Sequence, residues 1–130
     1  MIVQAPISLG ELIDKMTILE IKKEKIDDAE KLKNINQEYD ALSGVAQASI
    51  DSDKMRKIED HRARLRNVNL DLWQTEDEIR VRERDQDFGE AFVALARNVY
   101  RQNDARHRLK REIDEMLGSD LVEEKQHTRC

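Results

Sequence analysis

Residues 53–84 read DKMRKIEDHRARLRNVNLDLWQTEDEIRVRER, a stretch that contains neither glycine nor proline. Within it Ile58, Leu65, Leu72 and Ile79 are spaced seven residues apart. This spacing is typical of a long helix that packs along one seam. At a rise of about 1.5 Å per residue, the helix would be about 50 Å long. The sequence therefore predicts an elongated molecule, with the other segments packed along this helix.

Helical periodicity continues on both sides of the stretch. A second long helix is expected at 88–117, and a short turn around Gln86 makes it antiparallel to the helix at 53–84. On the N-terminal side, the apolar stripe changes phase near residue 27, which divides that region into a shorter helical pair at 8–26 and 28–43. We therefore expect an all-α, elongated helical bundle.

The chain of 130 residues is long enough for one domain, 1–130, with a single core. Residues 1–7 are mostly apolar and include the only proline, Pro6, so an extended N-terminal arm lying on the bundle is expected. The polar segment 123–130 is expected to be a frayed tail.

Capping residues place the helix ends. Helix starts are expected after Ser8, Asp27 and Asp87, because each is followed three residues later by a glutamate, as in a capping box. Stops are expected at Gly44 and Gly118, because glycine readily adopts the left-handed conformation that ends many helices. The loop that joins the helical pair to the long hairpin would then begin at Gly44.

Composition limits the classes of function. Charged residues make up 39% of the chain, aromatic residues 4%, and the formal net charge is −5. An acidic balance disfavours a general nucleic-acid-binding protein, and no apolar run has the length of a membrane span. The single cysteine, Cys130, and the absence of a signal pattern indicate a cytoplasmic protein. No pattern indicates a cofactor.

Polar residues interrupt the apolar seam of both long helices. Asn69 lies close to the seam of the first helix, and Asn103, Arg106 and Lys110 interrupt that of the second. A turn around Gln86 would place Asn69 opposite Asn103. Buried polar groups require hydrogen-bond partners, so the seam is either a device that fixes the helix register or a binding site.

A binding site on the seam would use side chains that reach the same zone of the hairpin. Trp73 could stack on a ligand there, although a lone tryptophan on a helix is usually a packing residue. The candidate ligand-binding residues are Asn69, Trp73, Glu76, Arg80, Asn103, Arg106 and Lys110. The sequence identifies no catalytic residues, because neither His61 nor His107 is accompanied by a nucleophile in a recognisable pattern.

Carboxylates at helical spacing offer a weaker hypothesis, a magnesium ion held between two helices. The candidate ligands are Glu11, Asp14, Glu76 and Asp77. Because aspartate and glutamate account for 28 of the 130 residues, such spacings also arise by chance. We therefore expect no metal site.

The helix at 88–117 is locally basic. The cationic residues are Arg97, Arg101, Arg106, Arg108, Lys110 and Arg111. Their positions scatter around the helix and only Tyr100 accompanies them, so a solvated face is a better interpretation than an RNA-binding groove.

Several strings resemble a family of short bacterial helical proteins to which no activity is assigned. They are Ser8–Lys15, Ile18–Lys22, Asn69–Trp73 with Glu76–Arg80, Asp87–Gly89, Asn103–Arg106 with Leu109–Ile113, and Val122–Lys125. The resemblance covers nearly the whole chain and implies an all-helical fold. It also implies a protein partner in cell-surface polysaccharide assembly.

The leading functional interpretation is a non-enzymatic interaction or scaffold protein. The helix at 8–26 bears apolar residues on two sides, with Leu12 and Leu19 on one face and Ile18 and Ile21 on another. One chain cannot cover both faces, so self-association through this helix or the next is expected, most simply as a homodimer. Two alternatives remain open: a protein or enzyme that binds a phosphosugar or nucleotide-sugar at the seam, and a carboxylate-metal nucleotide hydrolase.

Overall fold

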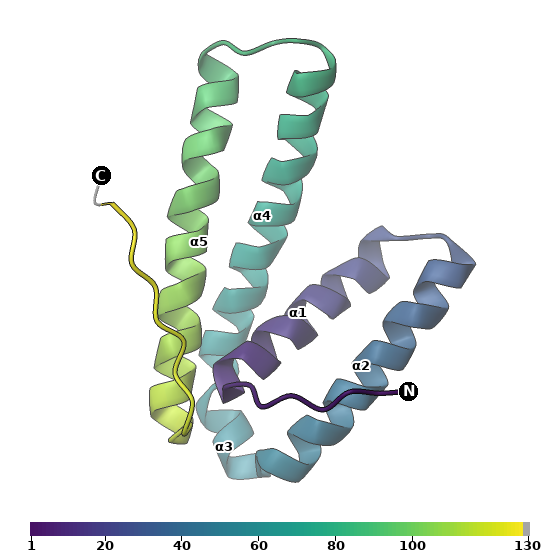
Figure 1. Cartoon of the computed structure of the whole chain (residues 1–130), viewed down its shortest axis with the longest axis vertical. Helices are drawn as coiled ribbons and strands as arrows, with labels where there is room; N and C mark the ends of the chain where they lie inside the picture. The colour runs from purple at the N-terminus through teal and green to yellow at the C-terminus, as the bar shows by residue number, and fades with distance from the viewer. Residues whose placement is uncertain (129–130) are drawn as a thin grey trace.

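A computed structural model of the chain describes residues 1–128 (Figure 1). The described part contains helices and no strand. The helices are α1 (Leu9–Lys25), α2 (Ala29–Ser49), α3 (Ser52–Lys57), α4 (Glu59–Arg84) and α5 (Glu90–Leu117). The predicted all-α fold class is therefore confirmed.

Two helical hairpins form an open V (Figure 1). The longer hairpin pairs α4 with α5 in antiparallel orientation, and the shorter one pairs α1 with α2. α1 packs against α4 and α5, whereas α2 packs on α1 and leans away from the long hairpin. The upper half of the α4–α5 hairpin therefore extends beyond the reach of α1 and α2 (Figure 1).

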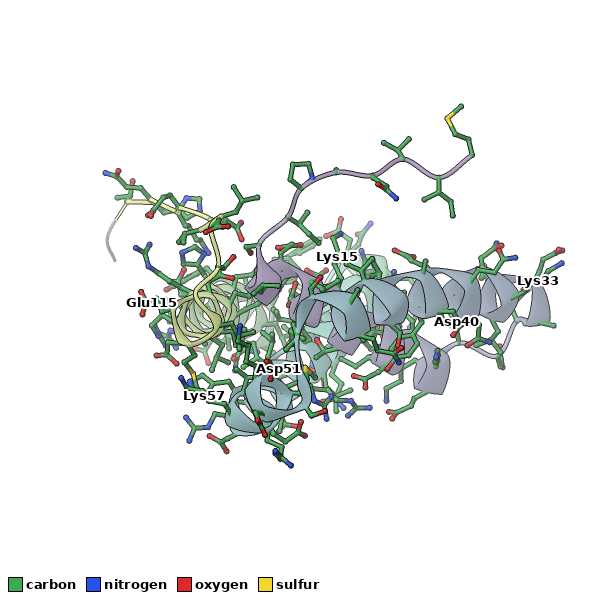
Figure 2. The ribbon with its side chains drawn as sticks, turned by 90° about the horizontal axis from the view of Figure 1, so that it is seen from below. Lys15, Lys33, Asp40, Asp51, Lys57 and Glu115 are labelled. Atoms are coloured by element: carbon green, nitrogen blue, oxygen red, sulfur yellow. The ribbon has the colours of Figure 1, made fainter. Side chains whose placement is uncertain are left out.

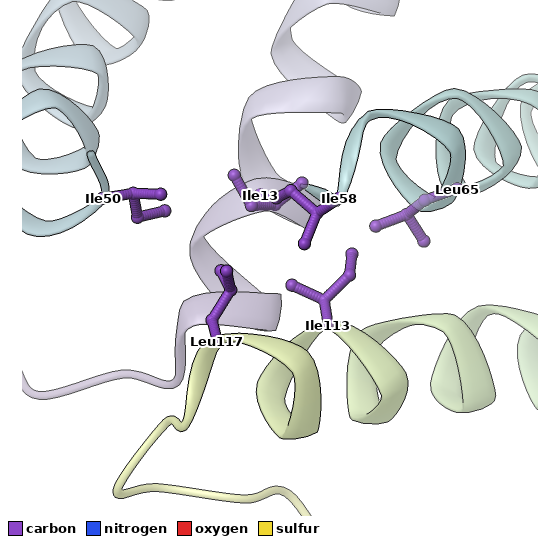
Figure 3. Close-up of a cluster of buried hydrophobic side chains, with 6 residues drawn as sticks. All are labelled: Ile13, Ile50, Ile58, Leu65, Ile113 and Leu117. Carbon is purple, nitrogen blue, oxygen red and sulfur yellow. The ribbon is translucent and has the colours of Figure 1, made fainter. Parts of the chain in front are cut away.

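The predicted long helix at 53–84 is interrupted at Ile58, so the expectation of one continuous helix is wrong. Ile58 has φ −98° and ψ 3°, and it ends α3 and precedes α4. Its side chain is fully buried in a cluster of six apolar residues (Figure 3). The cluster comprises Ile13, Ile50, Ile58, Leu65, Ile113 and Leu117. Burial of Ile58 accompanies the bend, although no glycine or proline marks it in the sequence.

The predicted end of the second helix at residue 43 is also wrong. α2 continues through Gly44 to Ser49. A glycine inside a helix costs about 0.5–1 kcal/mol relative to alanine. Continuation, however, buries Ala46 and brings Ile50 into the core, which offsets that cost.

The helix starts agree in part with the expected caps. Ser8 accepts a hydrogen bond from the Glu11 amide at 3.1 Å, as expected. The cap of α2 is Asp28 rather than Asp27. Asp87 does not cap α5: Gly89 occupies that position, and the Asp87 carboxylate lies 2.6 Å from Arg82.

The C-terminal cap of α5 has the expected conformation. Gly118 has φ 67°, the left-handed conformation that ends a helix, and its amide reaches back to the last turn. This glycine turns the chain out of α5 and into the segment that follows.

The N-terminal arm is extended, but it does not lie on the bundle. Ile2 and Val3 are 82% and 79% exposed, and the arm leads away from the helices (Figure 2). Ser8 starts α1 in an extended conformation, and Pro6 restricts the chain just before it, so the arm does not fold back along α1. The expectation of an arm packed on the bundle is therefore wrong.

The expected frayed tail instead runs back along α5 as far as the structure describes it (Figure 1). Three tail residues, Glu123, Glu124 and Lys125, form ion pairs with α5. Charge pairing therefore orders a segment whose polar composition suggested fraying. Cys130, on which the expected cytoplasmic location partly depends, lies outside the described residues. No helix in the described part is long and apolar enough to cross a membrane.

Candidate functional site

A buried carboxylate joins the three helices that meet at the base of the V. Asp14 of α1 is fully buried. Arg106 of α5 donates to it through Nε at 2.9 Å and Nη2 at 2.5 Å. Asn69 of α4 donates to the same carboxylate through Nδ2 at 2.9 Å. A charge buried this deeply is tolerated because it is paired and hydrogen-bonded.

Thr17 completes this network. Its hydroxyl donates to the backbone oxygen of Asp14 at 2.7 Å and accepts from Asn69 Nδ2 at 3.0 Å. Both hydrogens of the Asn69 amide nitrogen are therefore used on α1, which fixes the amide orientation. In the described part of the chain, no buried side-chain nitrogen or oxygen lacks a partner.

The network also fixes the charge of Arg106. The hydrogen bonds to Asp14 raise the pKa of Arg106 above its ordinary value, although burial opposes them. Arg106 is therefore a permanent cation whose charge is largely neutralised by one carboxylate. Its guanidinium is positioned by two bonds, as in a bidentate arginine–carboxylate pair.

Next to this network lies a second group of charges, centred on Lys110. The lysine is 7% exposed, and its Nζ lies 2.5 Å from a Glu11 oxygen and 2.6 Å from a Glu123 oxygen. Burial lowers the pKa of Lys110, but the hydrogen bonds to the two glutamates outweigh it and leave the pKa above its ordinary value. Lys110 therefore ties α1, α5 and the tail together.

A cleft of about 330 Å³ opens above the Asp14 network, between α1, α4 and α5. Its size is at the lower end of the range for small-molecule sites. It is lined by Ile18, Ile21, Asn69, Leu72, Trp73, Glu76, Asp77, Arg80, Asn103 and Arg106. Six of the seven candidate ligand-binding residues thus line one cleft, and Lys110 is the exception.

The cleft has an apolar side and a polar side. Ile18, Ile21 and Leu72 supply aliphatic surface beside the indole of Trp73. On the polar side, a carboxylate oxygen of Glu76 lies 3.5 Å from Nη1 of Arg80, which is one helical turn further along α4. A flat molecule could stack against the apolar side while hydrogen bonding to the polar one.

The expected pairing of Asn69 with Asn103 takes a different form. Both line the cleft, but the hydrogen bonds of Asn69 go to α1 rather than to Asn103. Other contacts support the expected antiparallel register: His61 lies 2.9 Å from Glu112, and Asn98 donates to Thr75 at 2.8 Å. α1 inserts Asp14 and Thr17 into the hairpin at this level, which is why Asn69 bonds across to α1.

The four weaker metal candidates do not form one group. Glu76 and Asp77 line the cleft, whereas Glu11 and Asp14 are held by Lys110 and Arg106. Within residues 1–128, no group of three or more histidine, cysteine, aspartate or glutamate side chains could hold a metal ion.

The central role of Asp14 was missed from the sequence, where it was only a weak metal candidate. A signal for it exists. Gly10, Asp14, Thr17 and Ile21 follow the i, i+4, i+7, i+11 spacing of one helix face, and all four are buried. Two polar residues within a buried stripe require partners on neighbouring helices.

Comparison with known families gives one match. The pattern of a family described as a family of unknown function (DUF6165) matches residues 3–129. No curated protein matches the chain. No solved structure matches it either.

Proposed function

Because the chain belongs to DUF6165, a family of unknown function, we propose a function from the site itself: the protein binds a small molecule in the cleft between α1, α4 and α5. The observation that carries this proposal is the convergence of six of the seven candidate residues, Trp73 among them, in one cleft. Concave sites with an apolar wall and a few fixed polar groups are typical of small-molecule binding.

The charges of the cleft indicate which part of a ligand it suits. Glu76 and Asp77 balance Arg80 and Arg106, and Asp14 already neutralises Arg106 from below. A phosphate would find little net positive charge there. The sequence suggests a phosphosugar or a nucleotide-sugar as the ligand. In either class, the cleft suits the uncharged sugar ring better than the phosphate.

Trp73 provides a direct test, because it is the only tryptophan in the chain. Titration with neutral sugars, sugar phosphates and nucleotide-sugars should change the Trp73 fluorescence for at least one ligand with a sugar ring. Asn103→Ala should weaken that response, because Asn103 lines the cleft. Asn67→Ala, at an exposed position on α4, is the matched control.

Two outcomes would contradict this proposal. One is the absence of a fluorescence change with every ligand, together with no shift in melting temperature. The other is an equal loss of response in Asn103→Ala and Asn67→Ala, because the signal would then not depend on the cleft.

A second candidate function, a self-associating scaffold, is favoured by exposed apolar residues at the turn of the α4–α5 hairpin. Val81, Phe88 and Val93 are 43%, 53% and 41% exposed. Of the residues expected to form such a surface on α1, Leu19 and Ile21 are buried within the chain. A homodimer formed through the hairpin end would cover the exposed residues, since symmetric pairing is the commonest form of self-association.

Light scattering tests this second candidate. At micromolar concentration the protein should have the mass of a dimer, and Phe88→Glu should reduce it to that of a monomer. Val45→Glu, which introduces the same charge at an exposed position on α2, should leave the mass unchanged. A monomeric wild type would contradict the candidate.

The metal-dependent hydrolase has less geometric support. Only two of its four candidate carboxylates, Glu76 and Asp77, reach the cleft, and the other two are neutralised by cations. Such sites need several carboxylates that converge from facing helices.

A further inference from the structure

A second hollow, larger than the cleft, lies between α5 and the C-terminal tail. It encloses about 1130 Å³. We call it the α5–tail groove, and its lining residues are Arg97, Val99, Tyr100, Arg101, Asn103, Asp104, His107, Arg108, Lys125, His127 and Thr128. Of these described residues, four are arginine or lysine and only Asp104 is acidic, so the groove is basic on a protein whose formal net charge is −5.

The arginines of the groove differ from the other arginines of the described chain. Nine of the twelve arginines within residues 1–128 form an ion pair with a carboxylate. These nine are Arg56, Arg62, Arg64, Arg66, Arg80, Arg82, Arg84, Arg106 and Arg111. The three without such a pair in this part of the chain are Arg97, Arg101 and Arg108, and all three line the groove. Their positive charge is therefore left for another partner.

Helix geometry explains why these three act together. Arg97, Arg101 and Arg108 lie at i, i+4 and i+11, which places them along one stripe of α5. The sequence interpretation of a scattered basic face included Arg106 and Lys110, which instead turn toward α1 and form ion pairs there. Arg111 is paired with Glu124, and the three remaining cations, Arg97, Arg101 and Arg108, form a line.

The tail forms the other wall of the groove. Glu123 and Glu124 hold it against α5 through Lys110 and Arg111, at 2.6 Å and 2.9 Å. This arrangement brings Lys125 and His127 to the groove beside the arginine stripe. Lys125 also lies 3.1 Å from Asp104, so the single acidic residue of the lining is already neutralised.

Tyr100 adds an aromatic surface. Its ring is 41% exposed and lies within the same stretch of α5, with the Arg101 guanidinium 6.0 Å from the ring centroid. An exposed aromatic ring beside unpaired arginines can stack on a flat base while the guanidinium groups bind phosphate oxygens.

From these observations we infer that the α5–tail groove binds a compact phosphate-bearing ligand of the nucleoside polyphosphate class. Arginine is suited to phosphate because its planar guanidinium donates two parallel hydrogen bonds. The acidic charge of the rest of the chain repels a long polyanion but acts weakly on a small ligand within the groove. The cationic residues of this site are distinct from those of the cleft, since no arginine of the groove lines the cleft, although Asn103 lines both.

Calorimetric titration of the full chain at low ionic strength tests the inference, with ADP and inorganic triphosphate as probes. Both should bind, and their affinity should fall as salt is added. The triple variant Arg97→Gln, Arg101→Gln, Arg108→Gln should bind both at least about tenfold more weakly, because it removes the charge-assisted hydrogen bonds. These side chains have no ion pair to lose in the described structure, so the variant should fold normally.

The matched control is Arg56→Gln, Arg64→Gln, Arg84→Gln. It changes the net charge by the same amount, at exposed arginines on α3 and α4 that lie outside the groove. It should retain affinity within about threefold, because the net charge of the chain acts only weakly at a distance. An equal loss in both triple variants, or no binding to the wild type, would overturn the inference.

Tyr100→Leu separates the aromatic contribution from the phosphate contribution. It should weaken ADP binding several-fold and leave triphosphate binding unchanged, because only ADP has a base to stack.

A short single-stranded RNA supplies the third probe. Tighter binding of the RNA than of ADP at the same salt concentration would overturn the compact-ligand assignment. Because none of these measurements uses Trp73, a negative result here leaves the cleft proposal to be tested separately.

Discussion

Gly10 marks the closest approach of α1 to α5. A Cβ at this position would lie 2.2 Å from the backbone oxygen of Lys110 and 2.8 Å from a carboxylate oxygen of Asp114. The Gly10 amide donates to that same carboxylate oxygen at 2.6 Å. The missing side chain therefore allows the hydrogen bond and the helix contact to form together. No other residue type could occupy this position without moving α1 away from α5.

Gly10→Ala should consequently destabilise the protein by about 1–3 kcal/mol, the usual cost of inserting a methyl group into a packed contact. Gly44→Ala is the matched control, because a Cβ at Gly44 meets nothing within 4 Å and the residue lies inside α2. It should stabilise the protein by about 0.5–1 kcal/mol. Urea unfolding of both variants measures the two free energies. Equal effects would show that the α1–α5 contact is looser than described.

The Asp114 carboxylate is 2% exposed, and burial raises its pKa above the ordinary value of 3.8. The hydrogen bonds from Gly10 and Ser8 and the charge of Lys110 lower the pKa, the charge of Glu123 raises it, and the net shift is upward. The folded protein therefore holds this proton more tightly than the unfolded chain does. The protonated Asp114 side chain contributes fully to stability below its ordinary pKa of 3.8. That contribution is lost as the pH rises through the higher pKa that Asp114 has in the folded protein.

Asp114→Asn removes this pH dependence and keeps an oxygen that can accept from Gly10. The variant should be more stable than the wild type at pH 7, and the difference should shrink as the pH falls toward about 4. Urea unfolding at several pH values checks this. A stability difference that stays constant with pH would contradict the prediction.

At the scale of the helices, α2 has the weakest attachment of the four longer ones, α1, α2, α4 and α5. Of its 21 residues only Ile35 and Ala46 are buried, and it packs on α1 rather than on the long hairpin. Regions with few buried apolar contacts open locally at a lower free energy than the whole molecule. The backbone amides of α2 should therefore exchange with deuterium faster than those of α4 around Leu65 and Asn69, which are buried. Equal protection of both segments would contradict this, since it would imply that α2 opens only with the core.

Most of the helices could be predicted from the sequence, because their signals are local. Ser8 and Gly118 act within one turn of their own position, and the seven-residue spacing of Leu65 and Leu72 repeats along one face. The break at Ile58 and the passage of α2 through Gly44 could not be predicted. Both follow from packing in the core, with Ile58 and Ile50 buried beside Ile13 of another helix.

The candidate site, like the helices, could be predicted from the sequence only in part. The spacing of polar residues on the two long helices identified Asn69, Trp73 and Asn103 as members of one zone, and all three line the cleft. The hydrogen bonds from Asn69 to Asp14 and Thr17 depend on where α1 crosses the hairpin, which is a tertiary relation. Sequence spacing within one hairpin carries no information about that crossing, so the bond was assigned to the wrong helix.

At the scale of the whole molecule, the V of two hairpins implies an extended particle in solution. α5 alone contains 28 residues and is therefore about 42 Å long. A compact chain of this length would have a radius of gyration of about 14 Å. Because α2 leans away from the long hairpin (Figure 1), the mass is spread further than in a compact bundle.

Small-angle X-ray scattering should give a radius of gyration clearly above about 14 Å. The data should be extrapolated to zero concentration, so that self-association does not inflate the radius. A monomer with a radius of about 14 Å would mean that the two hairpins close against each other, which would bury the cleft and remove the space proposed for its ligand.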